Sequence, residues 1–232
     1  MISEISFATQ YTSLWHILAP NSERFVRRIN LSVDRYDAEH SLLDSPDRRG
    51  FLNEIAFQLT RLKQNQPEAA IPDALVIAKE RLALLDRPQS DGLADPSPHE
   101  TESILALERS LSGFVREASR GDANVVVFEP AFPGCGLLNA SIGDILIGDA
   151  LYEVKAGDRL FRSTDLRQLV TYCAMNFAAR KYCVRRAGCI NPRRGTYFVL
   201  DLEIIAHELG GKSSPELFSE IVYHLSNSGV SR

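Results

Sequence analysis

The sequence predicts an α/β protein, with a mixed central sheet between helices and a mainly helical domain before it. Three observations predict this organisation. Apolar residues recur at helical spacing through residues 1–86. Residues 87–99 contain three prolines, one glycine and few apolar side chains. From residue 100 onward, helical and strand patterns alternate. We therefore expect a helical domain over 1–86, a linker over 87–99 and an α/β domain with C-terminal helices over 100–232.

The clearest helical pattern of the N-terminal domain lies at Leu52, Ile55, Ala56, Leu59 and Leu62, which share one helix face. A second helix is expected to begin near Asp73, whose carboxylate is suited to capping a helix N-terminus. Helical patterns also cover residues 11–18 and 23–31.

The elements expected in the α/β domain follow from the same periodicities. Helices are predicted at about 100–119 and 164–180, followed by two short ones at 201–209 and 214–226. Strands are predicted at 125–128, 144–147, 150–156, 181–184 and 196–200.

Composition places the chain among ordinary globular proteins, with 232 residues, 44% hydrophobic and 24% charged. It contains no uncharged apolar run of about 18 residues, so no membrane span is expected. The N-terminus lacks a basic segment followed by an apolar one, which favours a cytoplasmic protein. The four cysteines form no CxxC pair and predict neither a zinc site nor an iron–sulfur cluster.

Charge is distributed unevenly along the chain. Residues 155–194 contain ten basic and two acidic residues, a charge of +8, whereas the rest of the chain carries −12. This asymmetry favours a basic surface that binds phosphates, although solvated charge without a ligand is the alternative. The predicted contacts to nucleic acid are Arg159, Arg162, Arg167, Arg193 and Arg194.

Gly148 and Asp149 form a two-residue hairpin turn between two predicted strands. A turn of this length makes residue 147 face residue 150, and by the same register Asp144 faces Glu153. Lys155 lies two residues beyond Glu153 and therefore points to the same face. The opposite face is apolar, so it is expected to be buried.

Two carboxylates side by side repel one another, and a divalent cation between them would remove the repulsion. Asp144 and Glu153 are therefore predicted to bind Mg²⁺, with Mn²⁺ as a substitute. The chemistry that suits this set is metal-assisted hydrolysis of a phosphodiester, in which Lys155 orients water or stabilises developing charge. The alternative is an exposed hairpin with ordinary surface charges.

The pattern Gly143-Asp144, nine residues, then Glu153-Val154-Lys155 resembles the PD-(D/E)xK, or restriction-endonuclease-like, nuclease superfamily. Gln168 and Tyr172 match the QxxxY motif of the RecB-like groups, and their spacing puts them on one helix face. The resemblance covers roughly residues 100–200 and implies a restriction-endonuclease-like core. It implies catalytic roles for Asp144, Glu153 and Lys155, supported by Gln168 and Tyr172. Gly143 replaces the proline of the motif.

Many members of this superfamily also use an acid from the first core helix. Glu102 and Glu108 compete for this role, and Glu129, which follows the first strand, is a third candidate. Glu108 flanks the apolar stripe of its helix, so it is the acid we expect to bind the metal.

The leading hypothesis is a Mg²⁺-dependent deoxyribonuclease that acts in restriction, defence or repair. The alternatives are a module that retains the fold and binds nucleic acid or protein without cleavage, and an unrelated α/β enzyme. DNA is the expected partner, and the N-terminal helices are expected to serve a homodimer or a partner protein. The sequence contains no GxSxG elbow, no phosphate-binding P-loop and no HExxH motif.

Overall fold

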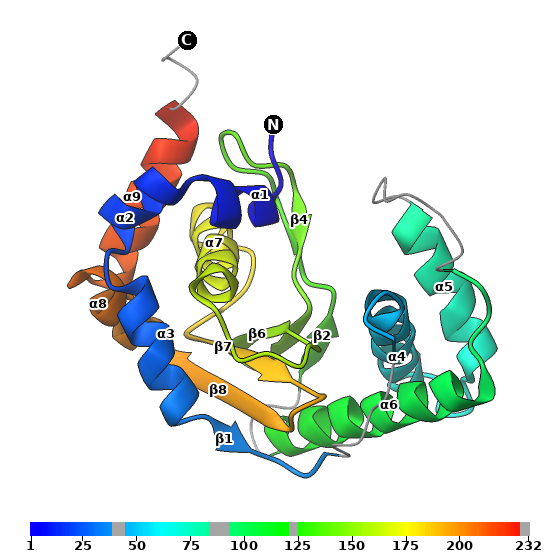
Figure 1. The fold of residues 1–232 in the computed structure, drawn as a ribbon. Helices are drawn as coiled ribbons and strands as arrows, with labels where there is room; N and C mark the ends of the chain where they lie inside the picture. Colours follow the sequence, from blue (N-terminus) through cyan, green and yellow to red (C-terminus); the bar gives the residue numbers. More distant parts are fainter. Residues whose placement is uncertain (39–44, 84–92, 121–124, 228–232) are drawn as a thin grey trace.

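A six-stranded mixed sheet forms the centre of the protein in the computed structural model, which describes residues 1–38, 45–83, 93–120 and 125–227. The strand order is β1-β8-β7-β6-β5-β2, and helices flank the sheet (Figure 1). The strands are β1 (Asp34–Arg35), β2 (Val126–Phe128), β5 (Ile145–Ile147), β6 (Ala150–Val154), β7 (Arg186–Asn191) and β8 (Thr196–Asp201). β6 and β7 are parallel, and the other neighbours in this sheet are antiparallel. The mixed α/β architecture predicted from the sequence is confirmed.

The hairpin of β5 and β6 has the register that its turn predicts. Ile147 pairs with Ala150, and Ile145 pairs with Tyr152. Gly148 has a φ of 58°, a left-handed conformation that glycine adopts without strain. The turn chemistry therefore determines which residues of the two strands face each other.

The two faces of this hairpin are covered by different helices. Ile145, Ile147 and Tyr152 are buried in one core cluster with residues of α6 (Pro98–Ala118), as the apolar pattern predicts. Leu146 and Leu151 point the other way, into a cluster that includes residues of α7 (Ser163–Ala179). Because side chains alternate along a strand, Glu153 belongs to the α7 face, and Lys155, just beyond β6, bonds Gln168 of α7. Asp144 lies at the end of the hairpin, where it bonds Val154 and lines a hollow with residues of α4 and α6.

The N-terminal helices are present, but they are divided between the two sides of the sheet (Figure 1). Helices α1 (Glu4–Gln10), α2 (Thr12–Leu18) and α3 (Ser22–Leu31) pack with α7, α8 (Leu202–Gly210) and α9 (Ser214–Asn227) in one cluster. Helix α4 (Arg49–Lys63) packs against both α5 (Ile71–Ala83) and α6, and the three helices share one core cluster. The described residues of this region, 1–38 and 45–83, therefore differ from the separate domain expected over 1–86, because their apolar faces are buried against helices that cover the sheet.

The first part of the expected linker over 87–99 lies outside the described residues, since 84–92 are not among them, whereas 93–99 are described. Its last residues belong to α6. Ser97 caps this helix by accepting a hydrogen bond from the backbone N–H of Glu100, whose side chain accepts one from the N–H of Ser97. This reciprocal cap explains why α6 begins at Pro98.

One predicted strand is wrong, and three short ones were not predicted. Residues 181–184 are not a strand, because the side chain of Asn176 bonds both the N–H and the carbonyl of Tyr182 and holds the chain in a turn. The strand begins at Arg186 instead. The unpredicted strands are β1 and the small hairpin of β3 (Ala131–Phe132) and β4 (Ser141–Ile142).

No helix in the described ranges has the length and the apolar character needed to cross a membrane.

Two glycines allow a matched test of the packing. A Cβ atom added at Gly188 in β7 would lie 1.9 Å from the carbonyl oxygen of Phe198, whereas one added at Gly113 in α6 would meet nothing within 4 Å. We expect Gly188→Ala to lower the free energy of unfolding by about 3 kcal/mol or more. Gly113→Ala should raise it by about 0.5–1 kcal/mol through helix propensity. Urea unfolding measures the free energy of unfolding of both variants, and equal changes in the two would contradict this account of the packing.

Candidate active site

Two carboxylates meet where β5 begins and β6 ends. Asp144 precedes β5, and its Oδ2 accepts a hydrogen bond of 2.6 Å from the backbone N–H of Val154. Glu153 is 4% exposed, and its Oε2 is buried without a hydrogen-bond partner. An unpartnered carboxylate oxygen is costly in a protein interior. The hairpin thus leaves a buried acceptor at the position where the sequence predicts a metal.

Lys155 connects this pair of acids to α7. Its Nζ donates to Oε1 of Glu153 and to Oε1 of Gln168, both at 2.8 Å. Its backbone N–H donates to the carbonyl of Ile190, which fixes the end of β6 against β7. The lysine is therefore held by both its main chain and its side chain.

The QxxxY residues extend this chain of hydrogen bonds along α7. Nε2 of Gln168 donates to the hydroxyl of Tyr172 at 3.1 Å. The hydroxyl proton of Tyr172 has two acceptors at 3.2 Å, the carboxylate of Glu4 and the carbonyl of Ile142. The structure thus brings all five predicted catalytic residues together around the end of the β5–β6 hairpin.

Glu4 belongs to this group and was not predicted from the sequence. It lies in the first turn of α1, and its Oε2 also accepts from Ser141 at 2.8 Å. Ser3 caps α1 by accepting a hydrogen bond from the N–H of Ser6. The Ser3 cap marks the start of a helix in the sequence, but no spacing relates Glu4 to Tyr172, because they are 168 positions apart.

Burial and like charge dominate the electrostatics of the site. Burial raises the pKa of Asp144 well above its usual range, and the charge of Glu153 raises it further. Burial also raises the pKa of Glu153, although Lys155 opposes this. Burial alone would lower the pKa of Lys155, but the charges of Glu153 and Asp144 outweigh it and raise the pKa above its ordinary value. Lys155 is therefore a cation at neutral pH.

The donor set fits a Mg²⁺ ion held by two carboxylates. No group of three His, Cys, Asp or Glu side chains with the geometry of a metal site occurs among the described residues. Mg²⁺ commonly uses one or two protein carboxylates, with water and substrate phosphate completing its shell. The unpartnered Oε2 of Glu153 supplies the free acceptor that such a site needs. The four cysteines are free thiols.

The structure does not bring Glu108, the expected helix acid, to this pair. Its side chain lies against α4, where it accepts from Nζ of Lys63 at 3.0 Å and from Ser112 at 2.7 Å. Leu107 and Leu111 of α6 line a hollow together with Asp144, but Glu108 does not. Glu102 is exposed on the same helix.

Glu129 and Glu54 lie closer to Asp144. The backbone N–H of Glu129 donates to the carbonyl of Asp144 at 2.8 Å, but its carboxylate is paired with Arg81 and Arg61. Glu54 of α4 lines a hollow of about 140 Å³ together with Asp144, and its charge contributes to the raised pKa of Asp144. Glu54 is also paired with Arg81, at 2.9 Å.

Three of the five arginines predicted to bind nucleic acid have structural partners. Arg167 is buried, with its guanidinium 5.9 Å from the centre of a Trp15 ring. Arg193 is also buried and donates to Asn53 of α4 and to the carbonyl of Ala156. Arg159 makes a two-pronged ion pair with Asp165. The expectation that Arg167 and Arg193 line a basic surface is therefore wrong, because both guanidinium groups are inside the protein.

Arg162 and Arg194 are exposed, as predicted. They lie at the end of the sheet where β6 finishes, because α7 starts at Ser163 and the turn between β7 and β8 spans residues 192–195. Arg162 and Arg27 line one shallow hollow of the surface, and Arg194 and Arg35 line another. The cations available at this end of the sheet thus include two that the basic segment of the sequence does not contain.

Comparison of the chain with family models, with curated proteins and with solved structures finds no match. The resemblance to the nuclease superfamily therefore rests on the motif residues and on their arrangement around Lys155.

The repulsion between the two acids predicts an effect of Asp144→Asn on stability. Because folding raises the pKa of both carboxyls, the metal-free protein should lose stability as pH rises above about 4, the ordinary carboxyl pKa. Asn retains an oxygen that can accept from Val154. At pH 7 in EDTA we expect the variant to melt about 2–4 °C above the wild type, with the difference disappearing toward pH 4.

Magnesium should reverse that order. Saturating Mg²⁺ should raise the melting temperature of the wild type by several degrees and leave Asp144→Asn unchanged, since a ligand stabilises only the state that binds it. Glu102→Gln, which removes an exposed carboxylate of α6, is the control and should respond to Mg²⁺ like the wild type. Equal Mg²⁺ responses of wild type and Asp144→Asn would exclude a metal site at this pair.

Proposed function

We propose that this protein is a metal-dependent nuclease that hydrolyses phosphodiester bonds of DNA, with a restriction-endonuclease-like core. One observation carries the proposal: Asp144, Glu153 and Lys155 converge at one end of a hairpin, with an unpartnered carboxylate oxygen among them. Restriction, defence and repair are the settings in which we propose that it acts.

In the proposed enzyme, Asp144 and Glu153 would hold Mg²⁺. The ion, when bound, polarises the phosphoryl oxygen and lowers the pKa of a water molecule. Asp144 already accepts from Val154 through Oδ2, and Glu153 from Lys155 through Oε1. These bonds fix the orientation of both carboxylates before any ligand arrives, which is the pre-organisation that a reactive site requires.

Lys155 would act as a cation rather than as a base. Its raised pKa keeps it protonated at neutral pH, so it does not accept a proton from water. An ammonium group beside the acids is suited to donate a hydrogen bond to a phosphate oxygen as negative charge develops there. Its three hydrogens allow this third bond while it retains those to Glu153 and Gln168.

Gln168, Tyr172 and Glu4 would position Lys155. The amide of Gln168 presents its oxygen to Lys155 because its nitrogen is engaged with Tyr172. Tyr172 is in turn held by Glu4 and Ile142. These residues act on the reaction through the lysine, so we assign them a positioning role.

Cleavage assays test the proposed activity. The substrates are linear, circular and single-stranded DNA with an RNA control, in Mg²⁺, Mn²⁺ or EDTA. We expect metal-dependent cutting of DNA that Lys155→Ala lowers by at least about 100-fold, the usual cost of removing a group that stabilises transition-state charge. Lys79→Ala removes a partly exposed lysine of α5 paired with Asp95, and it should cut like the wild type.

The same assay separates the proposal from the non-catalytic alternative. If pure wild-type protein cuts none of these substrates in Mg²⁺ or Mn²⁺ but still binds DNA, the chain is a binding module that retains the fold. If Lys155→Ala cuts as fast as the wild type, the activity comes from another site or from a contaminant.

Charge reversal tests where DNA binds. We expect Arg162→Glu and Arg194→Glu each to weaken DNA binding by about 3–10-fold and to lower the slope of log K against log salt by about one. Arg185→Glu makes the same change at an exposed arginine beside the start of β7, at the opposite end of the sheet. It should leave both quantities near wild type, and an equal loss in all three variants would indicate only the effect of net charge.

A further inference from the structure

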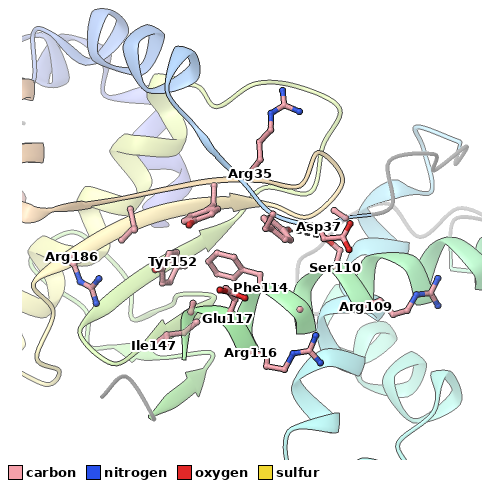
Figure 2. A pocket seen from close by; sticks show the side chains of 16 residues that line it. Arg35, Asp37, Arg109, Ser110, Phe114, Arg116, Glu117, Ile147, Tyr152 and Arg186 are labelled. Carbon is pink, nitrogen blue, oxygen red and sulfur yellow. Dashed lines mark hydrogen bonds between the residues drawn. The ribbon is translucent and has the colours of Figure 1, made fainter. Parts of the chain in front are cut away.

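A hollow of about 800 Å³ opens on the α6 face of the sheet, opposite Lys155. The edge strand β1 and the residues after it, the neighbouring strand β8, the second half of α6 and the start of β7 enclose it (Figure 2). Its volume falls in the range of roughly 300–1,000 Å³ that small-molecule sites occupy. Nothing in the proposed nuclease mechanism uses this hollow.

Aromatic rings form much of its wall. The ring of Phe114 lies at the centre of the group, 5.4 Å from Tyr36, 5.2 Å from Tyr152 and 5.1 Å from Tyr197, measured between ring centres. Phe114 and Tyr152 are buried, whereas Tyr36 and Tyr197 are partly exposed. Partly exposed tyrosines offer apolar ring surface to a planar ligand, and this stacking tolerates any base.

The lining is positively charged. It includes four arginines, Arg35, Arg109, Arg116 and Arg186, and two acids, Asp37 and Glu117. Figure 2 shows the guanidinium groups of Arg109, Arg116 and Arg186 around the periphery, with Phe114 and Tyr152 between them. Asp149, from outside the lining, accepts from Arg186 at 2.6 Å and steadies it. Planar guanidinium groups match the oxygens of a phosphate.

A glycine keeps part of this space open. Gly113 lines the hollow from α6, and a Cβ atom placed there would meet no atom within 4 Å. Glycine inside a helix costs about 0.5–1 kcal/mol relative to alanine. A larger side chain at this position would project into the hollow without displacing the backbone.

We propose that this hollow binds a nucleotide, with the base against Tyr36 and Tyr197 and the phosphate at the arginines of its rim. Glu117, which Figure 2 places beside Phe114, can accept a hydrogen bond from an N–H of the base. The nucleotide arrives either free or as one unit of a nucleic-acid strand, and both sources present the same chemistry. The site is distinct from the Asp144 site, because Tyr152 faces the hollow while Glu153, its neighbour in β6, faces α7.

Calorimetric titration of the full chain tests this proposal, using the ribo- and deoxynucleoside 5′-monophosphates and short single-stranded oligonucleotides. Gly113→Trp places an indole ring in the hollow and should weaken binding by at least tenfold, whereas Gly113→Ala should stay within about twofold of the wild type. Arg116→Glu reverses one charge of the rim and should weaken binding severalfold. Arg24→Glu reverses an exposed arginine of α3 outside the lining and should have little effect. Circular dichroism verifies folding, and Arg116→Glu keeps the test decisive if Gly113→Trp does not fold.

Binding of monophosphates that Gly113→Trp abolishes supports a site for a free nucleotide. Binding of oligonucleotides alone, with the same dependence on Gly113 and Arg116, supports a site for a unit of the strand. Absence of binding up to millimolar concentration, or binding that neither Gly113→Trp nor Arg116→Glu weakens, overturns the proposal. Lys155→Ala should bind nucleotides like the wild type. Failure of the nuclease proposal and failure of this proposal can therefore be told apart.

Discussion

The repulsion between Asp144 and Glu153 is the interaction on which the rest of the candidate site depends. The two-residue turn at Gly148 and Asp149 fixes the register, and the register places the two acids opposite each other at the end of the hairpin. Burial then raises the pKa of both. A fold that retains this pair must compensate for it elsewhere.

Lys155 provides the compensation in the metal-free protein. It neutralises one oxygen of Glu153 and leaves the other without a partner. Gln168 holds the lysine, Tyr172 holds the glutamine, and Glu4 holds the tyrosine. The chain of hydrogen bonds therefore runs from the sheet through α7 to the first turn of α1, so that the N-terminal helix supports a site more than a hundred residues away in sequence.

Arginines occur in two different settings around the candidate site. Arg193 joins α4 to the end of β6, and Arg159 ties the loop after Lys155 to the start of α7 through Asp165. These arginines stabilise the loops around the site, Arg193 from a buried position and Arg159 from a partly exposed one. Arg162 and Arg194 remain exposed beside them. A basic segment of sequence thus indicates where cations are concentrated without distinguishing structural cations from those available to a ligand.

The sequence by itself determined most of the elements and which residues gather around Lys155, because both follow from local rules. Turn type fixes the hairpin register, strand alternation places Lys155 with the acids, and helical spacing puts Gln168 and Tyr172 together. The prediction from sequence failed for residues 181–184, where the side chain of Asn176 overrides strand propensity.

Only the tertiary structure decided which faces meet. The apolar stripe of an amphipathic helix shows which face is buried but not which element it is buried against. The sequence therefore did not reveal that α1–α3 share a core cluster with α7, whereas α4 and α5 share one with α6. The same reason hid Glu4, whose role depends on a contact across 168 positions, and made Glu108 look suitable on a helix that covers the other face of the sheet. Periodicity determines the direction of a side chain within its own element, whereas long-range packing determines what that side chain touches.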